Sequence, residues 1–230
     1  MKVGKLIMGR NKSELIKNLK LTKPKSMEYF VNISKSKDRD KFVKRVERIV
    51  RSSMEYRDYI KFLKEHVHLD SCIFFQKVTN SGQNKSKRIS IEIHHEPFTL
   101  YDIVNTVVTK YQTEGLPIND LNIADEVMEL HYANKVGLVP LSKTAHQMIH
   151  DSVKLVVPLN LCYGTYSDFL EEYEPYIDES LYEKLERKMD ITANLTPESF
   201  DAIMKEFTYI EVDGFDDIEK METTSNVGVA

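Results

Sequence analysis

Two groups of histidines constrain the fold of this chain more than any other feature. The first group is the segment Glu92-Ile93-His94-His95, and the second is His146-Gln147-Met148-Ile149-His150. Apolar and polar residues alternate over Arg88–His94, which predicts a β-strand with Glu92 and His94 on one face. The second group has the helical i,i+4 spacing, which puts both imidazoles on one face of a helix. The two groups together predict a site at which imidazoles converge on a metal ion.

Composition places the chain among globular proteins without a membrane partner. Its 230 residues are 41% hydrophobic, which is enough for a sizeable core. No apolar run approaches the ~20 residues of a membrane span, and residues 1–25 lack a signal-peptide core. We therefore expect a cytoplasmic protein. Cys72 and Cys162 are far apart and form no CxxC pair, so we expect two free, buried thiols and no structural zinc.

Charge changes sign along the chain. Residues 1–64 carry 19 Lys and Arg against 7 Asp and Glu, whereas residues 155–230 carry 5 against 18. The basic part is either a surface for phosphates or a solvated helix face, and composition does not separate the two. We expect a basic, mainly helical region over 1–70, the histidine-bearing core over 71–153, an acidic helical region over 154–210 and an acidic, mobile tail over 211–230.

Hydrophobic periodicity predicts the elements around the histidines. A long helix is expected over 38–66, with Phe42, Val46, Ile49, Val50, Met54, Ile60 and Leu63 facing the core. Two strands, 71–78 and 88–95, are expected to form an antiparallel hairpin. Thr99 is the expected N-cap of a helix over 100–111. Further elements are expected as follows: helix 123–136, strand 138–141, the helix with the second histidine group capped by Ser142 or Thr144, and helices 167–173, 179–189 and 197–207.

These motifs resemble those of the HNH endonucleases, also called ββα-metal or His-Me finger nucleases. The likeness in motif is strongest to the nuclease colicins, and it covers residues 88–97 and 137–151. It implies an α+β fold in which a ββα-metal finger with a helical insertion is flanked by mostly helical N- and C-terminal regions. It also suggests a mobile-element or bacteriophage enzyme that works in the cytoplasm of a bacterial host cell.

The resemblance implies a role for each matching residue. His95 would be the general base, and one divalent metal would be held by His94, His146 and His150. Glu92 would orient a ligand, and Arg88 would clamp a phosphate. The middle position of the family motif falls on Gly137 here, so Asn134 is our candidate for that role and His131 a weaker one. His66, His68 and His131 are otherwise expected to be structural.

We therefore predict a metal-dependent endonuclease that hydrolyses DNA phosphodiester bonds. Mg²⁺ is the expected ion in cells, and imidazole ligands would also suit Zn²⁺, Ni²⁺ or Mn²⁺. DNA is the expected partner, and the acidic C-terminal region is a candidate surface for a protein partner. The alternative is a catalytically inactive, metal-stapled protein that binds DNA or another protein. Gln147 argues against a zinc protease, because it occupies the position of that chemistry's glutamate base and cannot take the proton.

Overall fold

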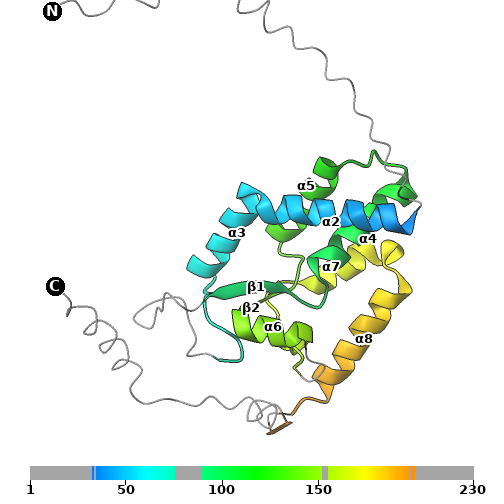
Figure 1. Ribbon diagram of the computed structural model, residues 1–230. Coiled ribbons are helices and arrows are strands. Elements are labelled where there is room, and N and C mark those ends of the chain that lie inside the picture. The colour runs from blue at the N-terminus through cyan, green and yellow to red at the C-terminus, as the bar shows by residue number, and fades with distance from the viewer. Residues whose placement is uncertain (1–32, 34, 76–89, 152–154, 197, 200–230) are drawn as a thin grey trace, which may run out of the picture. The chain divides into compact units, whose positions relative to one another are not determined.

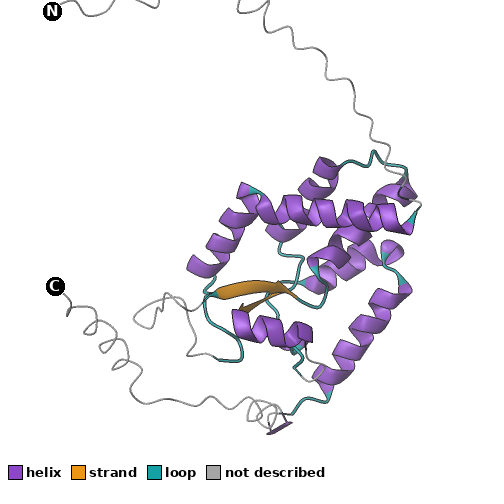
Figure 2. Ribbon diagram, in the orientation of Figure 1, coloured by secondary structure: helices purple, strands orange, loops and turns teal. Residues whose placement is uncertain are grey.

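The computed structural model describes residues 33, 35–75, 90–151, 155–196 and 198–199 (Figure 1). The chain divides into two units, residues 1–40 and 41–230, and helix α2 starts in the first unit. The described elements form an α+β protein, as predicted, with helices and a two-stranded antiparallel sheet (Figure 2). Every described helix is too short or too polar to cross a lipid bilayer. The α-helices and strands are, in order, α2 Ser36–Ser52, α3 Met54–Glu65, β1 Ile91–His95, α4 Leu100–Glu114, α5 Asp120–Tyr132, β2 Leu138–Ser142, α6 Lys143–Asp151, α7 Tyr166–Tyr173 and α8 Glu179–Ala193.

The described sheet pairs β1 with β2, and residues 71–75 lie beside β2 instead of forming the predicted hairpin with β1. The rest of that predicted hairpin, residues 76–89, lies outside the described residues. Strands β1 and β2 are antiparallel, and His95 lies opposite Leu138. Residues 71–75 form no strand in the described part of the chain, and the N–H of Ile73 donates to the carbonyl oxygen of Pro140 in β2 at 3.0 Å. Pro140 therefore turns its nitrogen, which has no N–H, away from β1, and the β1–β2 ladder loses no hydrogen bond. The first four residues of β2 are buried, and Ser142 at its end is half-buried.

The predicted helix over 38–66 is two helices, because Ser53 interrupts it. Ser53 has extended backbone angles (φ −65°, ψ 155°), and its Oγ accepts a hydrogen bond from the N–H of Tyr56 at 3.0 Å. This is the arrangement of an N-cap residue, which starts a new helix. The break also changes the buried face, so that Tyr56 and Tyr59 are buried while Met54, a predicted core residue, is 69% exposed.

Helices α4 and α5 fill the segment between the two strands, as predicted. Thr99 caps α4: its Oγ1 accepts from the N–H of Asp102, and the Asp102 carboxylate accepts from the N–H of Thr99. Gly115 ends the helix with a left-handed φ of 67°, which glycine adopts without strain. Helix α5 ends at Tyr132, before its predicted end at 136, and Asn134 turns the chain towards β2 with a φ of 61°.

The acidic helices predicted after residue 155 are present as α7 and α8. The aromatic rings of Phe169 and Tyr173 stack with their centroids 4.8 Å apart, and both side chains are buried. Helix α8 continues beyond its predicted end at Met189 to Ala193. Apart from residues 198 and 199, the helix predicted over 197–207 and the tail predicted over 211–230 lie outside the described residues.

An apolar cluster holds α6 against the sheet. Ile91 of β1, Val139 of β2 and Ala145 of α6 are all buried in it, so β1 and α6, which carry the two histidine groups, share one core with β2. Both cysteines are free, as predicted; Cys72 is buried in this cluster and Cys162 is partly buried beside it. Among the described residues, the buried members of this cluster are Cys72, Phe74, Ile91, Val139, Leu141, Ala145, Leu155 and Val157.

Candidate metal centre

The two histidine groups meet because β2 leads directly into α6, which packs on the sheet (Figure 1). Ser142, the last residue of β2, caps the helix: its Oγ accepts from the N–H of Ala145 at 3.2 Å. Ser142 is one of the two caps predicted. The face of α6 that carries His146 and His150 therefore lies over the face of β1 that carries His94.

The rings of His94, His146 and His150 form a triangle. Their centroids are 4.9 Å apart for His94 and His146, 5.3 Å for His94 and His150, and 4.8 Å for His146 and His150. One ring nitrogen of each residue lies within 4.8 Å of the other two. Two nitrogens bound to one ion at about 2 Å are at most about 4 Å apart, so small ring rotations suffice for all three to bind it. The structure thus brings together the three residues predicted as ligands.

The chemistry of this donor set fits a divalent transition metal. Three imidazole nitrogens suit Zn²⁺ or Ni²⁺ better than Mg²⁺, which prefers oxygen ligands. His94 is only 7% exposed, whereas His150 at the other side of the triangle is exposed. The site is therefore anchored in the protein at β1 and open to solvent at α6, which leaves room for a further ligand from water or substrate.

Carboxylates support two of the three imidazoles. Oε2 of Glu92 lies 2.6 Å from Nδ1 of His146, and Oε2 of Glu96 lies 3.3 Å from Nε2 of His94. The ammonium group of Lys188, on α8, pairs with Glu96 and also donates to the carbonyl oxygen of Pro97. Sequence reasoning found Glu92 but missed Glu96 and Lys188. The signal for Glu96 is that it continues the alternation of Glu92 and His94 by one more step.

The opposite face of β1 carries His95, as strand alternation predicts, and there it meets His131 of α5. The Nε2 atoms of the two rings are 2.9 Å apart, and Nδ1 of His131 lies 2.6 Å from the carbonyl oxygen of Val127. Tyr56 stacks on the His95 ring with an interplanar angle of 10°. Burial lowers the pKa of His131 from 6.5 to about 4 and that of His95 well below its usual value, so both are neutral at neutral pH.

The residue that contacts His95 is His131, the weaker of the two candidates for the middle position, and not Asn134. The backbone carbonyl oxygen of Asn134 accepts from the N–H and hydroxyl of Thr165, which fixes the turn after α5. The middle position itself cannot carry a side chain, because a Cβ on Gly137 would lie 1.9 Å from the carbonyl oxygen of Glu96. Arg88, the predicted phosphate clamp, lies outside the described residues.

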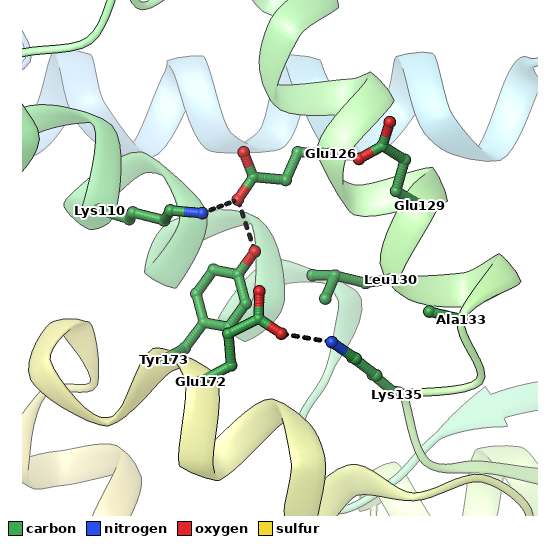
Figure 3. A pocket seen from close by; sticks show the side chains of 8 residues that line it. All are labelled: Lys110, Glu126, Glu129, Leu130, Ala133, Lys135, Glu172 and Tyr173. Carbon is green, nitrogen blue, oxygen red and sulfur yellow. Dashed lines mark hydrogen bonds and ion pairs between the residues drawn. The ribbon is translucent and has the colours of Figure 1, made fainter.

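A separate pocket of about 270 Å³ lies among α4, α5 and α7 (Figure 3). Glu126 of α5 links the three helices, since its carboxylate pairs with Lys110 of α4 at 2.8 Å and accepts a hydrogen bond from the hydroxyl of Tyr173 of α7 at 2.5 Å. Lys135 and Glu172 form a second pair there. These pairs neutralise most of the charge, and the lining contains no histidine, so we assign the pocket to helix packing. It is lined by Lys110, Glu126, Glu129, Leu130, Ala133, Lys135, Glu172 and Tyr173.

Comparison with known proteins gives a family but no characterised relative. No curated protein and no solved structure matches the chain. The family model of the bacteriophage G278-like virion proteins matches residues 5–222. This match confirms the predicted bacteriophage origin, while the likeness to HNH endonucleases stays a prediction. Because the match spans almost the whole sequence, the protein belongs to the bacteriophage G278-like virion protein family.

Proposed function

We propose that this protein is a metal-dependent endonuclease that hydrolyses phosphodiester bonds in DNA. The observation that carries the proposal is the meeting of His94, on β1, with His146 and His150, on α6, at distances that one cation can span. The order of the elements supports it, since β1, β2 and α6 follow one another as in a ββα-metal finger, with α4 and α5 as the insertion. The finger assignment is part of the proposal.

His94, His146 and His150 would hold the divalent cation, which would neutralise the charge that builds up on the phosphate during hydrolysis. Glu92 accepts the Nδ1–H of His146 and so fixes the orientation of that ring. His95 is neutral at neutral pH, the state in which an imidazole can accept a proton from an attacking water. We assign it the role of general base, and we assign Arg88 a contact with phosphate.

DNA is the proposed substrate, and helix α2 is the part of the described chain that suits its backbone. This helix exposes three basic side chains, Lys41, Lys44 and Arg48. It also carries Arg45 and Arg51, which pair with Asp120 and Glu47. Phosphate contacts of this kind weaken with rising salt. The acidic C-terminal region is a candidate surface for a protein partner, and location in the bacterial cytoplasm stays a prediction.

The test is cleavage of supercoiled plasmid by the purified full-length chain with Mg²⁺ or Mn²⁺. We expect nicked or linear products that EDTA abolishes. His95→Ala should abolish cleavage while leaving metal affinity nearly unchanged, and His66→Ala, which changes an exposed histidine outside the cluster, should cleave like the wild type. A wild type that leaves the plasmid intact with every divalent ion, or a fully active His95→Ala variant, would refute the assignment.

In a second candidate function, the protein is a catalytically inactive virion protein whose fold is stabilised by the bound metal. Two observations favour it: the family is one of virion proteins, and His95 is only 3% exposed. In this case chelation would lower the melting temperature by releasing α6 from β1. The plasmid would stay intact although the metal is bound, and this combination separates the two candidates.

A further inference from the structure

We propose that His131, on α5, is the positioning residue of the site, and that it holds His95 in the tautomer whose Nδ1 keeps its lone pair. This inference rests on the proposed function, in which His95 is the general base. It goes further by naming the nitrogen of His95 that can accept a proton. It also gives α5, part of the insertion between the strands, a direct role in the site.

The tautomers follow from a chain of two hydrogen bonds. The carbonyl oxygen of Val127 can only accept, so Nδ1 of His131, 2.6 Å away, carries the proton and donates. A neutral imidazole has one N–H, so Nε2 of His131 is an acceptor. Nε2 of His95, 2.9 Å from it, must therefore donate. The remaining nitrogen of His95, Nδ1, then carries the free lone pair, which a general base requires.

Packing fixes both rings in these orientations. Tyr56 stacks on His95 at a centroid distance of 6.3 Å and meets His131 edge-on at 5.6 Å. Tyr59 also meets the His131 ring edge-on, with the ring centroids 5.6 Å apart. His131 is completely buried, so a flip of its ring would leave the His95 N–H without an acceptor in a dry environment. The low pKa of His131 keeps the ring neutral and therefore able to accept.

There is also a steric reason why the hydrogen-bond partner of His95 comes from α5 and not from the segment before β2. Leu138, the first residue of β2, lies opposite His95, and Gly137 comes directly before it. A Cβ on Gly137 would lie 1.9 Å from the carbonyl oxygen of Glu96. No side chain from that position can reach His95. The contact comes instead from α5, whose inner face presents His131 one turn after Val127.

The first test is to read the tautomers directly from long-range ¹H–¹⁵N NMR spectra of the metal-free wild type at neutral pH. His95 and His131 are assigned from the signals lost in His95→Ala and His131→Gln. We expect the proton on Nε2 of His95 and on Nδ1 of His131. A proton on Nδ1 of His95 would overturn the inference, and this measurement does not depend on cleavage.

The second test compares substitutions of His131 in plasmid cleavage. His131→Phe keeps the ring volume but removes the acceptor, and it should lower kcat by about 100-fold or more with KM nearly unchanged. His131→Gln keeps an acceptor oxygen and should retain kcat within about tenfold. Tyr59→Phe, which changes another ring packed on His131, is the control and should cleave like the wild type.

Equal loss in the Phe and Gln variants with normal melting temperatures, or no loss in either, would contradict the positioning role. If His131→Phe does not fold, the Gln variant and the wild-type spectrum decide. Failure of the proposed function looks different: the wild type itself would cleave nothing, whatever tautomer His95 adopts.

Discussion

Glu92 and His146 join β1 to α6 across 54 residues of sequence, with Oε2 of the carboxylate 2.6 Å from Nδ1 of the ring. Because the carboxylate accepts the Nδ1–H, Nε2 of His146 keeps its lone pair and lies 3.1 Å from Nε2 of His150. The hydrogen bond to Glu92 thus leaves the lone pair of His146 Nε2 directed towards the other histidines. An imidazole held in this way by a carboxylate is a stronger metal ligand than a free one.

Glu92→Gln should therefore weaken metal binding by about 10-fold or more while leaving all three imidazoles in place. The amide keeps the shape of the side chain but loses the charge that makes the ring more basic. Affinity for Zn²⁺ or Ni²⁺ is measured by competition with a coloured chelator. Glu65→Gln, which changes an exposed carboxylate on α3, is the matched control, and equal affinities of the two variants would show that Glu92 does not support the site.

Lys188→Met should lower the free energy of unfolding by about 3 kcal/mol, because it leaves the carboxylate of Glu96 buried without its cation. The side chain of Glu96 is 3% exposed and that of Lys188 19% exposed. Lys184→Met is the control. Lys184 lies one turn earlier on α8 and pairs with Asp102, whose side chain is 20% exposed. This control should cost about 1 kcal/mol or less. Urea denaturation gives both free energies of unfolding. Similar losses in the two variants would mean that the burial of Glu96 does not make its pair with Lys188 more important for stability.

Stability should fall between pH 6.5 and 4 because of His131. In the unfolded chain this residue takes up a proton near its ordinary pKa of 6.5, whereas burial keeps it neutral in the fold down to about pH 4. Over this range the unfolded state binds more protons, so the free energy of unfolding decreases as the pH falls, by up to about 3 kcal/mol.

Urea denaturation in EDTA at several pH values measures this slope. His131→Gln should remove the share due to His131. A variant at residue 131 with the full wild-type slope would show that its pKa is not lowered by the fold.

Gly137→Ala should destabilise the fold by at least about 3 kcal/mol, since the new Cβ would lie 1.9 Å from the carbonyl oxygen of Glu96. Gly115→Ala tests backbone strain without a clash, because Gly115 has a φ of 67° but nothing within 4 Å of an added Cβ. We expect a loss of about 1 kcal/mol there. Melting temperatures rank the two variants, and a mild Gly137→Ala would mean that β2 can move away from Glu96.

The local patterns around the site could be predicted from sequence. Period-two alternation placed Glu92 and His94 on one face of a strand, and i,i+4 spacing placed His146 and His150 on one face of a helix. Thr99 could be predicted as a cap because a capping hydroxyl bonds within its own helical turn. In each case the deciding interactions lie within a few residues, where the periods of helix and strand fix the geometry.

The long-range partners could not be predicted in the same way. Residues 71–78 looked like the natural neighbour of β1, but the buried β2 pairs with it after an insertion of two helices. The contact between Glu96 and Lys188 spans 92 residues, and no local period signals it. Sequence position favours Asn134 for the middle role, because it lies only three residues before Gly137, whereas the contact of His131 with His95 depends on where the fold places α5. Ser53 was overlooked because the apolar period continues across it.

Metal binding by the purified full-length chain tests the central claim most directly. Calorimetric titration with Ni²⁺ or Zn²⁺, followed by elemental analysis, should show one ion per wild-type chain, released by EDTA. His146→Ala should lose more than the roughly 10–100-fold in affinity that an outer partner contributes, while His66→Ala should bind as the wild type does. A wild type that binds no ion, or a His146→Ala variant that binds as tightly as the wild type, would contradict the account.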